Sequence, residues 1–203
     1  MTKIFATVSL NSILAHDPCN PGLASFKTKF GHFGPDTHVP FLSCLESNSV
    51  RDVIWALRAV HQDISAVIPL IAADFAESVL HLFEEKFPDD DRPRKAIEAA
   101  RSGDRGKAKG AVDAARAAAS QATDAADDAD ADDADAAAAA YAARAAVYAA
   151  VYADAAADAT AYAAAQAVAV AAARATASTA AAADAAECNK QAETLRKYFT
   201  DKE

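Results

Sequence analysis

The sequence predicts an all-α protein, and two features support this fold class. Segment 111–186 is more than half alanine, the residue with the highest helix propensity, and no glycine or proline follows Gly110. Before this segment, apolar residues recur every three or four positions, which is the spacing of a helix with one buried face. We expect a compact multi-helix core in residues 1–110. Alanine-rich, closely packed antiparallel helices in residues 111–203 should pack on it, as a second region or within one domain.

Residues 1–48 are predicted to form short helices, because apolar residues with helical spacing alternate with Pro and Gly residues that stop a helix. The apolar sets are Leu10, Ile13 and Leu14; Leu23, Phe26 and Phe30; and Phe41, Leu42 and Leu45, the last directly after Pro40. A strand over residues 4–8 is also compatible with the sequence, although no partner strand is evident.

Residues 49–103 carry start and stop signals for three helices. Ser49-Val50-Arg51-Asp52 has the form of a capping box, with Asp in place of the usual Glu. The second helix should run from about Pro69 to Phe87, where Pro88 ends it. Its water-facing side is predicted to carry Asp74, Glu77, Glu84, Glu85 and Lys86, and its buried side Ile68, Ile71, Phe75, Val79, Leu82 and Phe83. Asp89 to Asp91 offer caps for a third helix that finishes at Gly103.

The alanine-rich segment is too long to be one helix. The 93 residues after Gly110 (203 − 110) would form a rod of about 140 Å, which is incompatible with a compact core. A dense run of aspartates is the expected break, because Asp is a poor interior helix residue but a good N-cap. We predict helices near 104–127, 134–157 and 159–198. The apolar tail (Leu195, Tyr198 and Phe199) should dock onto the N-terminal half or onto a second copy.

Charge is distributed unevenly along the chain. The net charge is −9 and the isoelectric point is near 5.0, so the protein is poorly suited to wrapping nucleic acid. Two groups are candidate partner-binding surfaces, although each also fits an ordinary solvated helix face. The acidic run consists of Asp124, Asp127, Asp128, Asp130, Asp132, Asp133 and Asp135. The basic stretch consists of Arg92, Arg94, Lys95, Arg101, Arg105, Lys107 and Lys109.

Catalytic, cofactor and metal sites are not predicted. Asp128, Asp130 and Asp132 alternate as at the start of a calcium-binding loop, but the next position holds Asp133 instead of Gly and the twelfth holds Ala139 instead of Glu. The five histidines lack zinc-ligand spacing with the cysteines. Neither a glycine-rich phosphate loop nor a nucleophile-elbow serine occurs. We expect a protein that is not an enzyme and needs no cofactor.

Cysteine usage and hydropathy indicate the compartment. The three cysteines are odd in number and dispersed, which fits a reducing cytoplasm better than a disulfide framework. Aspartates interrupt the alanine-rich segment, so no apolar run reaches the length of a membrane span. We therefore expect a cytoplasmic protein with no membrane association.

Three segments carry a resemblance to a known family. They are NSVRDVIWALR at 48–58, AADFAE at 72–77 continued by VLHLFE at 79–84, and PDDDRPRKAIEAA at 88–100. Together with the alanine repeats that follow, they resemble the immunity proteins of bacterial polymorphic-toxin systems and the alanine-rich relatives carried by phages and prophages. The resemblance covers about residues 48–180. It implies a non-enzymatic all-α protein that neutralises another protein.

The leading hypothesis is an inhibitor of the immunity type. Its acidic run would occupy a basic surface on a toxin, or on a nuclease whose nucleic-acid groove it imitates. A phage-encoded inhibitor of a host defence nuclease, including an anti-CRISPR protein, is a close variant. One alternative is a structural or oligomerisation module, for which a homodimer is the simplest form. Another is a nucleic-acid binder that uses the basic stretch, although the net charge makes this less favourable.

Overall fold

The computed structural model describes residues 2–128, 134–154 and 181–202, and this part of the chain is predominantly helical, which confirms the all-α prediction. Its α-helices are α1 (Leu10–Leu14), α2 (Asn20–Phe30), α3 (Val50–Ala56), α4 (Ile68–Lys86), α5 (Arg92–Arg101), α6 (Arg105–Asp128), α7 (Ala134–Asp154) and α9 (Ala181–Tyr198). Two 3-10 helices are also present, η1 (Phe41–Glu46) and η2 (Leu57–Ala59).

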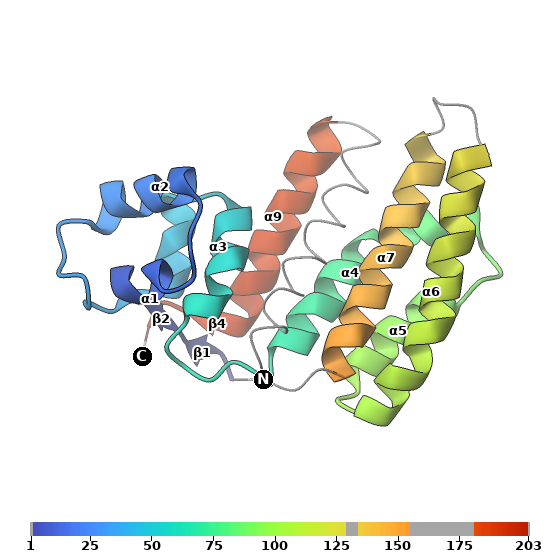
Figure 1. Cartoon of the computed structure of the whole chain (residues 1–203), viewed down its shortest axis with the longest axis horizontal. Coiled ribbons are helices and arrows are strands. Elements are labelled where there is room, and N and C mark those ends of the chain that lie inside the picture. The colour runs from blue at the N-terminus through green and yellow to red at the C-terminus, as the bar shows by residue number, and fades with distance from the viewer. Residues whose placement is uncertain (1, 129–133, 155–180, 203) are drawn as a thin grey trace.

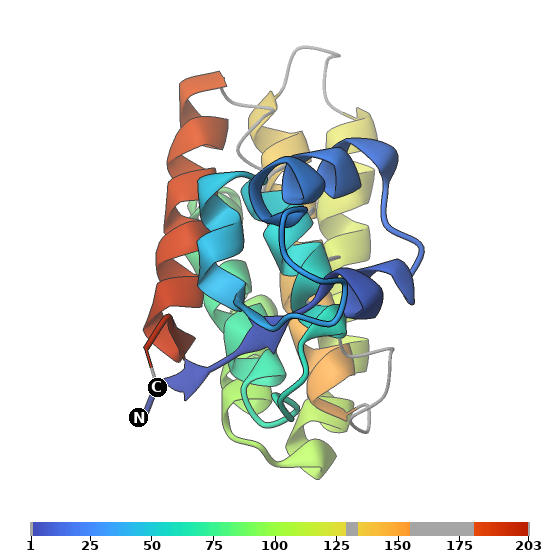
Figure 2. The same ribbon diagram turned by 90° about the vertical axis from the view of Figure 1, so that its left-hand side faces the viewer.

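The helices form an elongated body with α4 near its middle (Figure 1). Helices α6 and α7 run antiparallel, and both pack against α5, while α7 also packs along α4. Helix α9 lies on the other side of α4, next to α3, and the short N-terminal helices form the far end. Figure 2 shows that the two chain ends lie close together beside α9. Helix α7 packs on α4 and α5, and α6 packs on α5, so the parts of the chain before and after residue 110 contact each other. The division into two regions at residue 110 stays a prediction.

Two small strand pairs connect distant parts of the chain. Strand β1 (Ile4–Phe5) pairs in parallel with β4 (Phe199–Thr200), and β2 (Thr7–Val8) pairs antiparallel with β3 (Val39–Pro40). A strand over residues 4–8 therefore has partners, contrary to the sequence-based expectation. The reason is that one of them lies at the opposite end of the chain, where local sequence gives no indication of the pairing.

The apolar tail docks within the chain, which is the first of the two arrangements predicted for it. Leu195 and Phe199 are fully buried, and the Phe199 ring contacts the Phe41 ring edge-on, with 5.1 Å between the centroids. Since this apolar surface is covered intramolecularly, the tail provides no free face for a second copy of the chain.

The helix starts and stops follow the local signals. Ser49 caps α3, and its Oγ accepts a hydrogen bond from the Asp52 N–H at 3.2 Å while the Ser49 N–H donates to Asp52 Oδ2 at 3.2 Å. This confirms the capping box. Helix α4 begins at Ile68 with a proline in its first turn, and α5 is followed by Gly103, whose φ of +67° favours glycine. The predicted helix boundaries in residues 49–103 are therefore confirmed.

The alanine-rich segment folds back on itself as the length argument requires. Helix α6 ends at Asp128 and α7 begins at Ala134, within a residue of the predicted boundaries on both sides of the aspartate run. The last helix ends at Tyr198, as predicted, while its predicted start near 159 and the predicted end of the preceding helix at 157 lie outside the described residues.

Alanine contributes more to the core than expected from its size. We expected the hydrophobic core in the first half of the chain, where the large apolar residues lie. Instead one buried cluster includes both the large side chains of α4, such as Phe75 and Phe83, and the alanines of α7, such as Ala142 and Ala146. The expectation was wrong because small side chains let helix backbones approach closely, so alanine is buried completely and gains dispersion contacts.

The close packing of α7 can be tested by enlarging one of its buried side chains. Ala146 has no exposed surface, and we predict that Ala146→Leu lowers the free energy of unfolding by about 1–3 kcal/mol, because the added atoms force α7 away from its neighbours. Urea unfolding followed by circular dichroism would measure it. The matched control is Ala114→Leu on the exposed face of α6, expected to stay within about 0.5 kcal/mol of the native protein. Equal effects at both positions would contradict close packing.

Candidate functional site

The acidic run falls at one end of the α6–α7 pair, where α6 finishes and α7 starts (Figure 1). Asp124 and Asp135 are exposed at this end. Asp127 and Asp128 belong to the last turn of α6, although their side chains are not described, and Asp130, Asp132 and Asp133 lie outside the described residues. The described aspartates therefore gather at a helix-pair end and point to solvent where their side chains are placed.

Helix dipoles make this placement unfavourable on the α6 side. The C-terminal end of a helix carries a partial negative charge, and an acid there costs roughly 0.3–1 kcal/mol at low ionic strength. Helix α6 has no basic residue in its last turn to offset Asp127 and Asp128. On the α7 side, Asp135 sits favourably in the first turn. Folding of α6 alone gives no reason for this concentration of acids.

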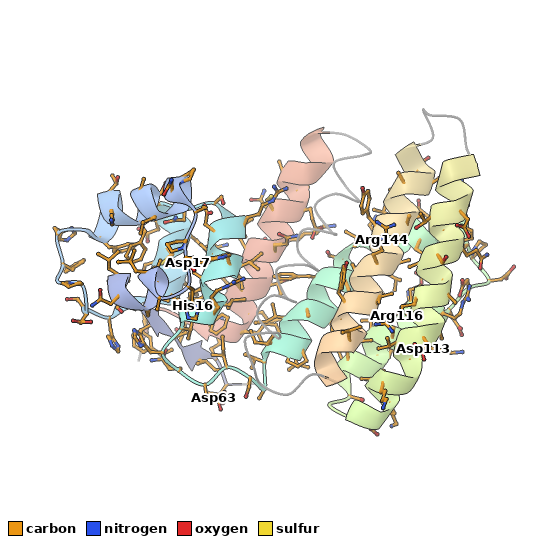
Figure 3. The ribbon with its side chains drawn as sticks, in the orientation of Figure 1. His16, Asp17, Asp63, Asp113, Arg116 and Arg144 are labelled. Atoms are coloured by element: carbon orange, nitrogen blue, oxygen red, sulfur yellow. The ribbon has the colours of Figure 1, made fainter. Side chains whose placement is uncertain are left out.

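Few cations near this end are available to neutralise it. Arg144 of α7 donates a hydrogen bond to Thr123 Oγ1 at 3.2 Å and lies over the Tyr141 ring, 5.7 Å from its centroid (Figure 3). Arg116 forms an exposed pair with Asp113 further down α6, with an N–O distance of 3.3 Å. Neither arginine makes a described contact with Asp124 or Asp135.

The basic stretch is used within the protein. Arg94 donates two hydrogen bonds of 2.7 Å to the Glu84 carboxylate, and Arg92 pairs with Asp90 at 2.5 Å and also donates to Gln121 of α6. Exposed pairs are formed by Lys95 with Asp91 and by Lys107 with Asp104. The side chain of Arg105 is not described, and Lys109 is exposed. Arg92, Arg94 and Arg101 therefore join α5 to neighbouring helices, while Lys95 and Lys107 form local pairs.

The spacing of charged residues in the sequence matches the ion pairs between α4 and α5. Glu77 and Glu84 are seven residues apart on α4, and Arg94 and Arg101 are seven apart on α5, which is two helical turns in each case. In antiparallel helices this spacing places Glu84 beside Arg94 and Glu77 beside Arg101, and both pairs form. Reading the two helices against each other would have predicted these pairs, whereas each helix taken separately indicates only solvated charge.

Asp74 is the centre of the most connected polar cluster, which we name the Asp74 network. Its carboxylate accepts hydrogen bonds from Arg101 at 2.6 Å, from Lys197 at 2.6 Å and from the Tyr198 hydroxyl at 2.8 Å. Arg101 also donates to Glu77. The Asp74 side chain is only 11% exposed, so the prediction that it faces water was wrong. The physical reason is that α9 returns from the end of the chain and covers this face of α4.

The network changes the proton affinity of its members. Burial alone would raise the pKa of Asp74, but hydrogen bonds from Lys197, Arg101 and Tyr198 outweigh it and hold the pKa below its ordinary value. For Tyr198, burial and the Asp74 charge both raise the hydroxyl pKa. The pKa of Arg101 is also raised by its carboxylate partners, so Arg101 and the Tyr198 hydroxyl stay protonated at neutral pH beside an ionised Asp74. A carboxylate that accepts three hydrogen bonds has the character of a structural link between α4, α5 and α9.

A second buried carboxylate lies on α9. Glu187 is 1% exposed, and its Oε1 accepts hydrogen bonds from Ser78 Oγ at 2.8 Å and from Gln191 Nε2 at 3.2 Å. Burial raises the pKa of this carboxyl group, and the hydrogen bonds only partly oppose that effect. This cluster joins α9 to α4 on the side away from solvent.

A mostly apolar pocket of about 370 Å³ lies in the N-terminal part, between α2 and α3. Phe26, Val53 and Ala56 contribute to its walls, and Trp55 and Cys19 lie along its edge. Its size fits a small side chain or ligand. Sequence reasoning did not anticipate this pocket, because the two helices that enclose it are separated by the β3–η1 connection.

Neither a metal-binding cluster nor a membrane-spanning helix is found in the described part of the chain. Its His, Cys, Asp and Glu side chains form no group of three that could hold a metal ion. Its helices also lack the combination of length and apolarity that crossing a bilayer requires. His61 and His81 are exposed.

Comparison with known proteins identifies the class. The sequence model of one family, described as Imm-5 like putative immunity protein, matches residues 59–198, which include α4, α5, α6, α7 and α9. No match was found among curated proteins or among solved structures. The helical body around α4 is thus the part that the family shares. The chain belongs to the Imm-5 like family of immunity proteins.

The Asp74 network predicts a specific loss of stability on neutralisation. Asp74→Asn should lower the free energy of unfolding at pH 7 by about 1–2 kcal/mol, a value reduced for the partial exposure of Arg101 and Lys197. Because the folded-state pKa of Asp74 is lowered, its contribution is complete above the unfolded-state pKa of about 3.9 and is lost as the pH falls through the folded-state value.

Urea unfolding of both proteins between pH 2 and 7 would measure this difference. Glu85→Gln is the matched control, since it removes the same charge from an exposed position of α4. Its effect should be within about 0.5 kcal/mol. A difference between Asp74→Asn and the native chain that persists unchanged down to pH 2 would contradict an ionised Asp74.

Proposed function

We propose that this protein is a non-enzymatic inhibitor that binds a partner protein through the acidic run at the end of the α6–α7 pair. The observation that supports this proposal is the concentration of aspartates around the end of α6 and the start of α7. Asp124 and Asp135 are exposed there, and Asp127 and Asp128 belong to the last turn of α6, where the helix dipole disfavours acids. A surface kept at a cost to local stability is typical of a functional site. Membership of an immunity protein family fits a role in binding another protein.

The partner that complements this surface is a protein with a basic face. Opposite charges steer the encounter of two proteins and raise the association rate. A dense run of aspartates also resembles the phosphate row of a nucleic acid in charge, so a nuclease with a basic groove is the partner class that fits best. A toxin nuclease and a defence nuclease both have such a groove, and a phage-encoded inhibitor of the anti-CRISPR type is one form of the same mechanism.

Other uses of the chain receive less support. The basic stretch is the alternative surface, for binding nucleic acid. Most of its described cations form ion pairs with carboxylates of the same protein. An oligomerisation role would need an unpartnered apolar face, and the tail that offered one is covered. We therefore expect a partner protein to be recognised by the acidic run.

The proposal is tested with a partner captured from the native host and identified by mass spectrometry. Replacing all seven aspartates of the acidic run by Asn should slow association at low salt by at least about tenfold and flatten its dependence on ionic strength. Surface plasmon resonance at several salt concentrations would measure both.

Two double variants show whether binding depends on where the negative charge lies or only on the net charge of the protein. Asp124→Asn with Asp135→Asn should weaken binding by about two- to thirtyfold, on the basis of about 0.2–1 kcal/mol for each of the two exposed charge contacts. Glu85→Gln with Glu98→Gln removes the same charge from exposed positions of α4 and α5 and should leave binding nearly unchanged. Unchanged low-salt affinity after neutralising the acidic run would refute the proposal.

A further inference from the structure

Two arginine side chains differ from the others in the described part of the chain. The arginines with a described partner are Arg58, Arg92, Arg94, Arg101, Arg116 and Arg144. Arg51 of α3 and Arg196 of α9 are exposed and make neither a hydrogen bond nor an ion pair with the described residues. The chain has 29 acidic and 20 basic residues, so a shortage of carboxylates does not explain two unpaired guanidinium groups.

Both arginines line the same hollow, which we name the arginine hollow. It has a volume of about 620 Å³ and lies where η1 and the start of α3 face α9. Ser49 and Asn189 add polar groups, and Leu45 and Val50 add an apolar wall. No acidic residue is among the described residues that line it. Two positive charges therefore face a concave surface without a compensating negative charge.

The carboxylates nearest in sequence are engaged or turned elsewhere. Asp52 follows Arg51, but its Oδ2 accepts from Ser49 and its Oδ1 accepts from Cys19. Glu46 pairs with Lys29 at 2.5 Å. Glu193 lies one turn before Arg196 on α9, but it lines a different cavity, the one beside Asp74, and not the arginine hollow. The positive charge of the arginine hollow thus remains available to a ligand.

We propose that the arginine hollow binds a small organic phosphate. The phosphate group would lie between Arg51 and Arg196, and the organic part would rest against Leu45 and Val50. A phosphate monoester carries a charge of about −1.5 to −2 at pH 7, which matches two guanidinium groups. Arginine also offers a planar pair of donors that fits phosphate oxygens. The volume lies within the usual range of about 300–1,000 Å³ for small-molecule sites.

The site combines two parts of the chain. Arg196 lies within the segment shared with the immunity protein family, whereas Arg51 lies before it. The ligand would therefore contact the family's helical body and the N-terminal region together. This binding is separate from the inhibitor function, because the described aspartates of the acidic run lie on α6 and α7 and none of them lines the arginine hollow.

Calorimetric titration of the full chain at low ionic strength tests the proposal. The probes are adenosine 5′-monophosphate, inorganic phosphate, adenosine and succinate. We expect adenosine 5′-monophosphate to bind at least about tenfold more tightly than adenosine or succinate, because only the monoester combines the phosphate charge with an apolar body. Inorganic phosphate should bind more weakly but at the same site. Arg51→Gln and Arg196→Gln should each weaken the binding of the monoester about tenfold.

Arg116→Gln is the matched control, since it removes one positive charge from the exposed face of α6 and should leave binding unchanged. Neither arginine of the hollow forms a hydrogen bond or an ion pair with the described residues. Both Gln variants should therefore keep the native circular dichroism spectrum and the native midpoint of urea unfolding. Arg51→Lys retains the charge without the planar donors and should bind with intermediate affinity. The proposal is overturned if neither phosphate probe binds at millimolar concentration. Equally tight binding of adenosine or succinate, or an equal loss in Arg116→Gln, would also overturn it.

Discussion

Close approach of the alanine-rich helices to α4 is the constraint on which the rest of the structure depends. An alanine buries too little surface to hold a helix in place by size, so α7 is stable only where its backbone lies near large side chains. Helix α7 packs along α4, whose Phe75 and Phe83 are buried in the same apolar cluster as the alanines of α7. Because this contact requires α7 to lie along α4, it also determines where the α6–α7 pair ends.

Ion pairing then determines which charges are exposed to a partner. Cations that follow α4 in the sequence form ion pairs with acids of the same protein, and the main ones are Arg94 and Arg101. Asp124 and Asp135, the acids described at the end of the α6–α7 pair, make no ion pair with the described residues. The protein is therefore acidic where the helix pair ends, although a basic stretch lies directly before that pair in the sequence. This separation of charge is the physical basis of the proposed inhibitor surface.

The N-terminal region completes the helical body that the family shares. Strand β1 pairs with β4 directly after α9, and Phe41 packs on Phe199. These contacts bring α3 beside α9 and so create a surface that residues 59–198 cannot form by themselves. The apolar pocket and the arginine hollow both involve this region. Both therefore include residues that precede the segment matched by the family model.

The sequence by itself determined the helical class, the capping box at Ser49 and the break of the alanine-rich segment at its aspartates. Helix propensity, capping and helix length act over a few residues, so a local pattern is sufficient to predict them. Tertiary structure alone decided the burial of Asp74, the pairing of β1 with β4 and the placement of Arg51 and Arg196 around one hollow. Each of these depends on α9 and the tail returning to the N-terminal half, and the free energy of that contact comes from residues far apart in the sequence.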